Sequence, residues 1–171
     1  MLACNGDGLL GDGSRTASDF GSLSEDRAWT WRSEVTADTA SVDLDVDETQ
    51  LLHGRWGSGA IELRRGSRWA DAETVGEITF SQPDEGLKLG GWTLDGESGG
   101  SALLAEARPE NGVPTAHCET VLDLPVETFY GLFQRTLVAD CGGEGVWSFE
   151  AGVGLIQVEA SGLVLDLVAP Y

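Results

Sequence analysis

Apolar and polar residues alternate along much of the chain, and a period of two residues is typical of half-buried β-strands. The alternation is clearest at residues 41–47, where Val42, Leu44 and Val46 would face a core and three aspartates would face solvent. Residues 163–167 repeat it with leucine at every second position. The pattern also predicts strands at residues 27–31, 60–64, 74–80, 86–94, 102–107, 115–122, 128–138, 146–149 and 153–158.

Sequences rich in glycine, proline and aspartate separate many of these segments, as expected of turns, and no stretch shows a helical repeat over three turns. In residues 74–80 and 87–94 the inward-facing set slips by one position, at Gly76 and across Gly90 and Gly91. Such a slip is typical of a β-bulge, and bulges bend a sheet. We therefore expect one all-β antiparallel domain of about ten strands, whose curved sheet closes into a barrel or half-barrel, with a β-sandwich as the alternative.

The charge of the chain restricts its partners. Its 171 residues suffice for one core, and they carry 29 acidic residues against 10 lysines and arginines, a net charge of −19. Nucleic acid is not expected as a partner, because binding a polyphosphate requires cationic neutralisation. We expect the outward aspartates of residues 41–47 to be a solvated acidic face, with a cation-binding ladder as the alternative. The acidity itself is expected to reflect salt adaptation or compositional bias, with a specific cation site as the alternative.

The first residues resemble the end of a bacterial lipoprotein signal, in which a leucine and two small residues precede a cysteine that becomes lipid-modified. Here the corresponding residues are Met1, Leu2, Ala3 and Cys4, with Met1 in the place of the usual leucine. Residues 1–26 are rich in glycine, serine and aspartate with almost no apolar period, which is typical of a flexible tether. We expect a lipid on Cys4 to hold an all-β domain at residues 27–171 on the periplasmic or outer side of a membrane in the bacterial cell envelope; a ragged terminus with a free thiol is the alternative.

A second motif covers the C-terminal third of the chain. A Pro-x-x-Thr-Phe element is followed by Trp-x-Phe-x-x-Gly-Val-Gly-x-Ile, and this pattern is similar to the C-terminal part of TapB-like exported bacterial proteins of unknown function. Val126 and Glu127 depart from it where alanine and glycine are usual. The resemblance implies export and a β-rich, barrel-like fold. The matching residues are Pro125, Thr128, Phe129, Trp147, Phe149, Gly152, Val153, Gly154 and Ile156.

Three cysteines leave one internal pair if Cys4 carries lipid. That pair is Cys118 and Cys141. An exported protein meets an oxidising compartment, so we expect a disulfide between them, with two buried thiols as the alternative. Closing a loop of this length would stabilise the fold by about 3 kcal/mol in the chain-entropy account.

Residues with catalytic or metal-binding chemistry do not form a recognisable constellation. His117 neighbours Cys118, but adjacent side chains of a strand point to opposite faces. His53 has no cysteine or carboxylate at ligand spacing, so neither a metal site nor a cofactor is predicted. Carboxylate pairs such as Glu73 and Glu77 are expected by chance among 29 acidic residues, although two carboxylates are what a glycan-active hydrolase would need.

The tryptophans suggest a second kind of function. If the curved sheet encloses a cavity, some of them would line it and could hold a lipid or another apolar ligand; packing in a core is the alternative. We therefore expect a non-enzymatic envelope lipoprotein that binds a ligand or supports a protein partner. A carrier of an apolar ligand is the alternative, and a hydrolase comes third. The candidate lining residues are Trp29, Trp31, Trp92 and Trp147.

Overall fold

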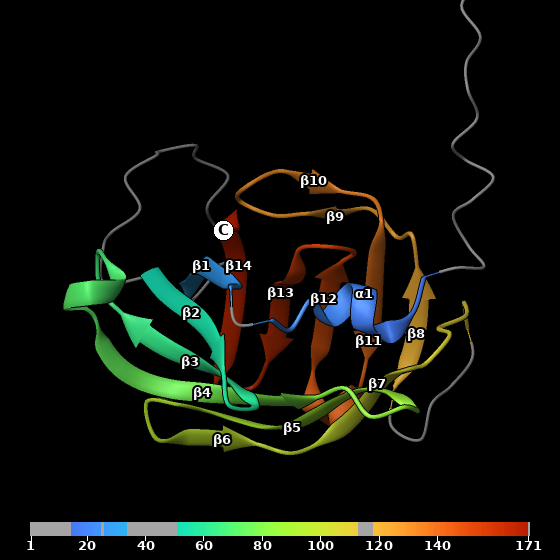
Figure 1. The fold of residues 1–171 in the computed structure, drawn as a ribbon, viewed down its shortest axis with the longest axis horizontal. Helices are drawn as coiled ribbons and strands as arrows, with labels where there is room; N and C mark the ends of the chain where they lie inside the picture. Colours follow the sequence, from blue (N-terminus) through green and yellow to red (C-terminus); the bar gives the residue numbers. More distant parts are fainter. Residues whose placement is uncertain (1–14, 25, 34–50, 113–117, 171) are drawn as a thin grey trace, which may run out of the picture.

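A single antiparallel sheet, curled into a half-barrel, makes up most of the computed structural model (Figure 1), which describes residues 15–24, 26–33, 51–112 and 118–170. The all-β class and the curved sheet predicted from the alternation are confirmed. Along the sheet the strand order is β6-β5-β4-β3-β2-β1-β14-β13-β12-β11-β8, with β7 beside β5. The strands are β1 Ala28–Ser33, β2 Leu51–Gly57, β3 Ala60–Arg65, β4 Glu73–Ser81, β5 Gly86–Leu94, β6 Glu97–Gly99, β7 Ala102–Glu106, β8 Glu119–Leu122, β11 Thr136–Asp140, β12 Val146–Glu150, β13 Gly154–Ala160 and β14 Leu163–Pro170.

Three of the sequence predictions fall outside the described residues. These are the lipid-bearing Cys4, the strand at residues 41–47 and the histidine at position 117. Within the described residues, β1 pairs with both β2 and β14, so the first and last strands of the sheet lie side by side in its middle.

Bulges interrupt the sheet at or beside the predicted positions. The register between β4 and β5 slips at Gly90, and that between β3 and β4 slips at Val75, beside Gly76. A Cβ at Gly76 would clash with the carbonyl oxygen of Thr93, so the close approach of β4 and β5 requires glycine there. These irregularities contribute to the bend of the sheet.

The single strand predicted at residues 128–138 was wrong. A small separate hairpin, β9 Val126–Glu127 and β10 Leu132–Phe133, precedes β11. Thr128 and Gly131 exchange backbone hydrogen bonds of 2.9 and 3.1 Å, which close a tight turn at the start of the predicted strand. The apolar residues on both sides of this turn obscured it in the sequence.

Strand β2 lacked a sequence signal because glycine occupies one of its inward positions. The side chain of Trp31 fills the space where a Cβ of Gly54 would lie. The alternation is therefore hidden: Leu52 is fully buried, and the next inward position carries no side chain.

Aromatic side chains fill the space inside the curve. Phe80 of β4 makes edge-to-face contacts with Trp147 and Phe149 of β12, with ring centroids 6.0 Å apart in each pair. Trp29 and Trp31 stack at 5.7 Å. The contacts of Phe80 join strands that lie far apart along the sheet, so the curl is held by a packed interior.

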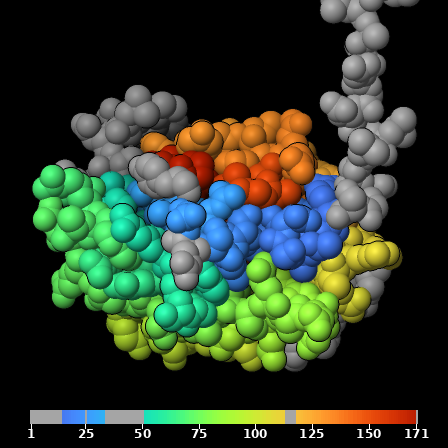
Figure 2. Space-filling view, in the orientation of Figure 1, coloured from blue at the N-terminus to red at the C-terminus, as the bar shows by residue number. Residues whose placement is uncertain are grey.

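Helix α1, Ala17–Gly21, packs against the sheet next to β12 and β13 (Figure 1), and its Phe20 is fully buried. In Figure 2 the blue N-terminal residues lie between the green strands and the orange and red ones. Residues 15–24 therefore belong to the folded domain, whereas the sequence analysis included them in the tether. A helix of five residues is too short to show a periodic pattern.

Hydrogen bonds fix α1 at both ends. The backbone N–H of Thr16 donates to the Asp19 carboxylate at 2.6 Å, and that of Gly152 donates to the Asp19 carbonyl at 2.8 Å. The N–H of Ala17 donates to the carbonyl of Ala107 at 3.3 Å. The helix thus connects segments from opposite ends of the sheet.

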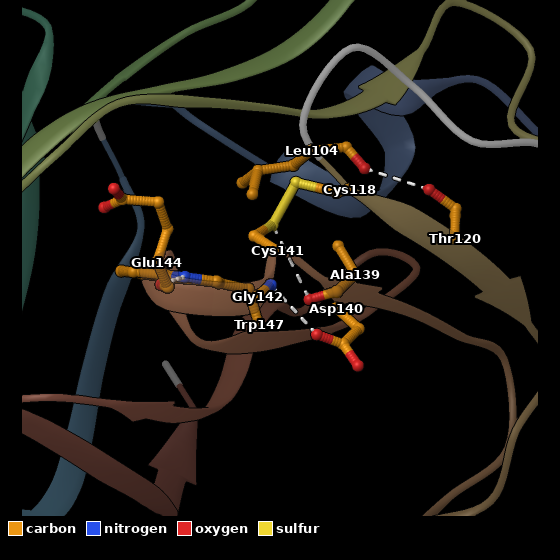
Figure 3. Close-up of a disulfide and its surroundings, with 9 residues drawn as sticks. All are labelled: Leu104, Cys118, Thr120, Ala139, Asp140, Cys141, Gly142, Glu144 and Trp147. Atoms are coloured by element: carbon orange, nitrogen blue, oxygen red, sulfur yellow. Dashed lines mark hydrogen bonds between the residues drawn. A yellow bond between two sulfur atoms is a disulfide. The ribbon is translucent and has the colours of Figure 1, made fainter.

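A disulfide joins Cys118 to Cys141, the pair that the sequence predicted (Figure 3). It ties the residue before β8 to the residue after β11, across a sequence separation of 23. Nearby, the hydroxyl of Thr120 donates to the carbonyl oxygen of Leu104 in β7 at 3.1 Å. The edge strand β8 is therefore fixed on one side by the disulfide and on the other by β7.

Replacing Phe20 with alanine tests whether α1 is part of the core. The F20A variant is expected to lose about 3–5 kcal/mol of unfolding free energy, because a buried aromatic ring leaves a cavity. Urea unfolding followed by far-UV circular dichroism measures this change. The exposed S24A variant is the control and should stay within about 0.5 kcal/mol of the parent. Equal stability of F20A and S24A would contradict the packing of α1.

Candidate functional site

The described residues form a cavity of about 410 Å³ beside β1, β2 and the connection from β3 to β4. His53 pairs with Thr30 on one side and with Arg64 on the other, so these three side chains share the face of the sheet that points away from the core. The inward positions between them are occupied by Trp31 and other buried residues. The lining residues are Ala28, Trp29, Thr30, His53, Gly54, Arg55, Ser67, Arg68 and Trp69.

His53 fixes the wall of this cavity. Its Nε2 lies 2.8 Å from the carbonyl oxygen of Gly66, and its Nδ1 lies 3.0 Å from the hydroxyl of Thr30. A carbonyl oxygen only accepts, so Nε2 carries a hydrogen, and in the neutral ring Nδ1 accepts from the hydroxyl. His53 therefore ties the β3–β4 connection to β1, and neither ring nitrogen is left for a metal or a substrate.

Trp69 forms the aromatic side of the cavity. It opens the short 3-10 helix η3, Trp69–Asp71, and two guanidinium groups lie over its ring. Those of Arg55 and Arg64 are 4.6 and 4.3 Å from the ring centroid. At these distances the cations are attracted to the face of the indole, which holds Trp69 beside the cavity.

Most arginines around the cavity already have a carboxylate. Arg64 donates to Glu62 at 2.8 Å, Arg68 to Asp71 at 2.5 Å, and Arg65 to Asp95. The hydrogen bond from Arg64 lowers the pKa of Glu62. Likewise, the hydrogen bond from Arg65 lowers the pKa of Asp95, so both carboxylates stay ionised at neutral pH.

Arg55 differs from these arginines because no carboxylate among the described residues pairs with it. No aspartate or glutamate lines the cavity either, within the part of the chain that the structure describes. Residues 51–69 hold four arginines and one acidic residue, in a chain whose net charge is −19. Among the described residues, Arg55 thus adds a positive charge to this cavity that no carboxylate balances.

The chemistry of this site suits an organic anion. Arg55 offers guanidinium N–H donors to a carboxylate, sulfonate or phosphate, and Ser67 and Thr30 contribute hydroxyls to the lining. The indole of Trp69, which carries the two guanidinium groups over its ring, adds apolar surface to the lining. A volume of about 410 Å³ lies within the usual range of small-molecule sites.

The four tryptophans proposed to line a lumen lie in the core. Trp31 and Trp147 are fully buried, and Trp92 is 5% exposed. Trp31 donates its indole N–H to Leu155 at 3.1 Å. Trp29 is also buried, although it contributes to the wall of the outer cavity. Trp69 was not among the tryptophans that the sequence predicted to line a cavity. The cluster of four arginines in residues 55–68 is the sequence feature that could have indicated it.

A second, more open hollow of about 610 Å³ carries three carboxylates, those of Glu85, Glu106 and Glu110. All three side chains are exposed, and no described hydrogen bond orients them. The described residues contain no group of three or more histidines, cysteines or carboxylates that could hold a metal ion. This hollow therefore lacks the fixed pair of carboxylates that a glycoside hydrolase typically uses.

The comparisons with known proteins do not assign a function to the chain. No protein-family profile, curated protein or solved structure matches the chain. The resemblance of the C-terminal third to TapB-like exported proteins therefore stays a prediction.

Replacing His53 with phenylalanine tests its role in fixing the wall. The H53F variant keeps an aromatic ring but leaves Thr30 and the Gly66 carbonyl without their partner, so we expect a loss of about 1–3 kcal/mol in unfolding free energy. Urea unfolding measures it, with the exposed R55Q variant as the control. A loss no larger than that of R55Q would show that His53 does not hold the β3–β4 connection.

Proposed function

We propose that the protein is a non-enzymatic binding protein of the bacterial cell envelope, whose β domain holds a small organic anion in the cavity beside Trp69. The observation that carries this proposal is the unpaired guanidinium of Arg55 next to an indole face, in a cavity without described carboxylates. An arginine without a carboxylate partner stands out on a protein of net charge −19, and binding of an anion would explain its presence.

A membrane anchor is the second part of the proposal. The leucine and alanine before Cys4 support lipid attachment, and that cysteine is the one left after the disulfide is formed. Among the described residues there is no helix with the length and apolar character to cross a membrane. We place the protein on the periplasmic or outer side of the membrane that carries the lipid.

Transport of an apolar ligand inside the half-barrel has less support. The tryptophans that would line such a lumen pack against Phe80 and each other in the interior. Helix α1 adds the ring of Phe20 to the same core. Binding in the outer cavity leaves this packing intact, so we favour it over the carrier. A hydrolase comes last, because the exposed carboxylates of the second hollow have no fixed geometry.

Binding of 2-naphthoate tests the proposed site. Binding is measured by isothermal titration calorimetry in about 0.1 M salt. The Debye length is then about 10 Å, so the salt screens distant charges. The R55Q variant should bind about tenfold to a hundredfold more weakly, because a hydrogen bond to a charged group contributes about 1.5–3 kcal/mol. The W69A variant should also bind more weakly, since it removes the apolar face.

Two controls make this experiment selective. The R108Q variant loses an exposed arginine at the acidic hollow and should bind 2-naphthoate as the parent does. The neutral analogue 2-naphthylmethanol should bind the parent and R55Q equally weakly. Equal losses in R55Q and R108Q, or equal affinity for the neutral analogue, would refute an anion site at Arg55.

The anchor is tested by expressing the chain in a bacterium behind the charged and apolar regions of a lipoprotein leader. Intact-mass measurement of the membrane fraction is expected to show a diacylglyceryl group on Cys4. The C4S variant should lack this mass and should leave the membrane fraction. A free thiol at Cys4 in the parent would contradict the anchor without affecting the anion site.

A further inference from the structure

One segment exposes large apolar side chains to solvent. The described exposed ones are Leu124, Phe129, Tyr130 and Leu132, with exposed fractions of 45, 39, 57 and 59%. All of them lie in residues 124–133, which we name the apolar hairpin; it contains β9 and β10. A cluster of this kind on a soluble domain marks a contact surface.

The apolar hairpin is held in place by the sheet. The backbone N–H of Tyr130 donates to the carbonyl of Leu167 in β14 at 2.8 Å, and that of Phe129 donates to the Asp166 carboxylate at 3.2 Å. The ring of Tyr130 stacks on Phe133 with centroids 5.9 Å apart. The exposed side chains are therefore presented by a fixed turn rather than by a frayed loop.

The N-terminal segment enters the domain next to this hairpin. Arg15, the first described residue, pairs with Asp123 at 2.7 Å, and Asp123 directly precedes Leu124. Eleven residue steps separate Cys4 from Arg15, which limits their separation to about 38 Å when fully extended. An anchor on Cys4 would therefore hold Arg15, and with it the Asp123 end of the apolar hairpin, within about 38 Å of the bilayer.

We propose that the apolar hairpin inserts into the headgroup region of the phospholipid bilayer to which Cys4 is tied. The proposal rests on the anchoring proposed above and orients the domain on the membrane. Tyrosine and phenylalanine are suited to this depth, because their rings are apolar and the tyrosine hydroxyl stays in water. The guanidinium of Arg32 lies 6.0 Å from the ring centroid of Phe129, so a positive charge stands beside the hairpin.

Charge favours a bilayer over a second copy of the chain. Residues 124–135 contain one glutamate and one arginine, so the segment is locally neutral, whereas each molecule carries a net charge of −19. Two copies meeting at this surface would repel each other, and a zwitterionic bilayer would not. Four exposed side chains also form a small surface compared with a stable protein interface.

Lipid-dependent quenching tests the proposal. Cys4 is the cysteine outside the disulfide, so in protein produced without a lipoprotein leader it can be coupled to maleimide phosphatidylethanolamine in phosphatidylcholine vesicles. In the Y130W variant, brominated phosphatidylcholine should quench most of the emission of the added indole. The matched T93W variant, with its indole at an exposed position of β5, should keep its emission. Adding L132S to Y130W should reduce the quenching.

Three results would overturn the proposal. Equal quenching of Y130W and T93W would show that the domain has no preferred orientation on the bilayer. Unquenched emission of Y130W would show that the hairpin stays in water, even with the tether in place. Concentration-dependent dimerisation of the uncoupled chain in sedimentation, abolished by L132S, would assign the surface to a second copy. Since the coupling replaces cellular lipidation, these results are independent of the fate of Cys4 in the cell.

Discussion

The contact of Phe80 with Trp147 and Phe149 is the interaction on which the rest of the structure depends. A curled sheet exposes its inner face unless side chains from distant strands meet across it, and this contact joins β4 to β12. Each aromatic pair adds about 0.5–1.5 kcal/mol beyond the burial of its area. Phe20 of α1 extends the same core, so a short N-terminal helix belongs to the domain.

A filled interior leaves the outer surface for binding. The acidic chain places four of its arginines in residues 55–68, where β2, β3 and η3 meet. His53 fixes the β3–β4 connection, and Trp69 gives the resulting cavity an apolar side. On another part of the molecule, the apolar hairpin rests on β14 beside the point where the described chain begins. We propose different tasks for the two surfaces, ligand binding for the cavity and membrane contact for the apolar hairpin.

Period-two alternation was sufficient to predict the class, the curved sheet and most strands, because it records directly which face of each strand is buried. It failed where a glycine removed an alternating side chain, where a turn lay among apolar residues, and where a helix was too short. These three places are Gly54 in β2, the Thr128–Gly131 turn and helix α1. The cavity could not be predicted, since it depends on the fold of the β3–β4 connection over His53. Cys118 and Cys141 were within reach of sequence reasoning because few cysteines left few pairings.

The most direct test of the binding site is an amide and indole NMR map of the full chain titrated with 2-naphthoate. We expect saturable chemical-shift changes at the indole N–H of Trp69 and at the backbone amides of Arg55 and Ser67. The indole signals of Trp31 and Trp147 should stay unchanged, because both rings belong to the packed core. Shifts centred on those buried indoles or on the apolar hairpin, with Trp69 unaffected, would contradict a ligand site in the cavity.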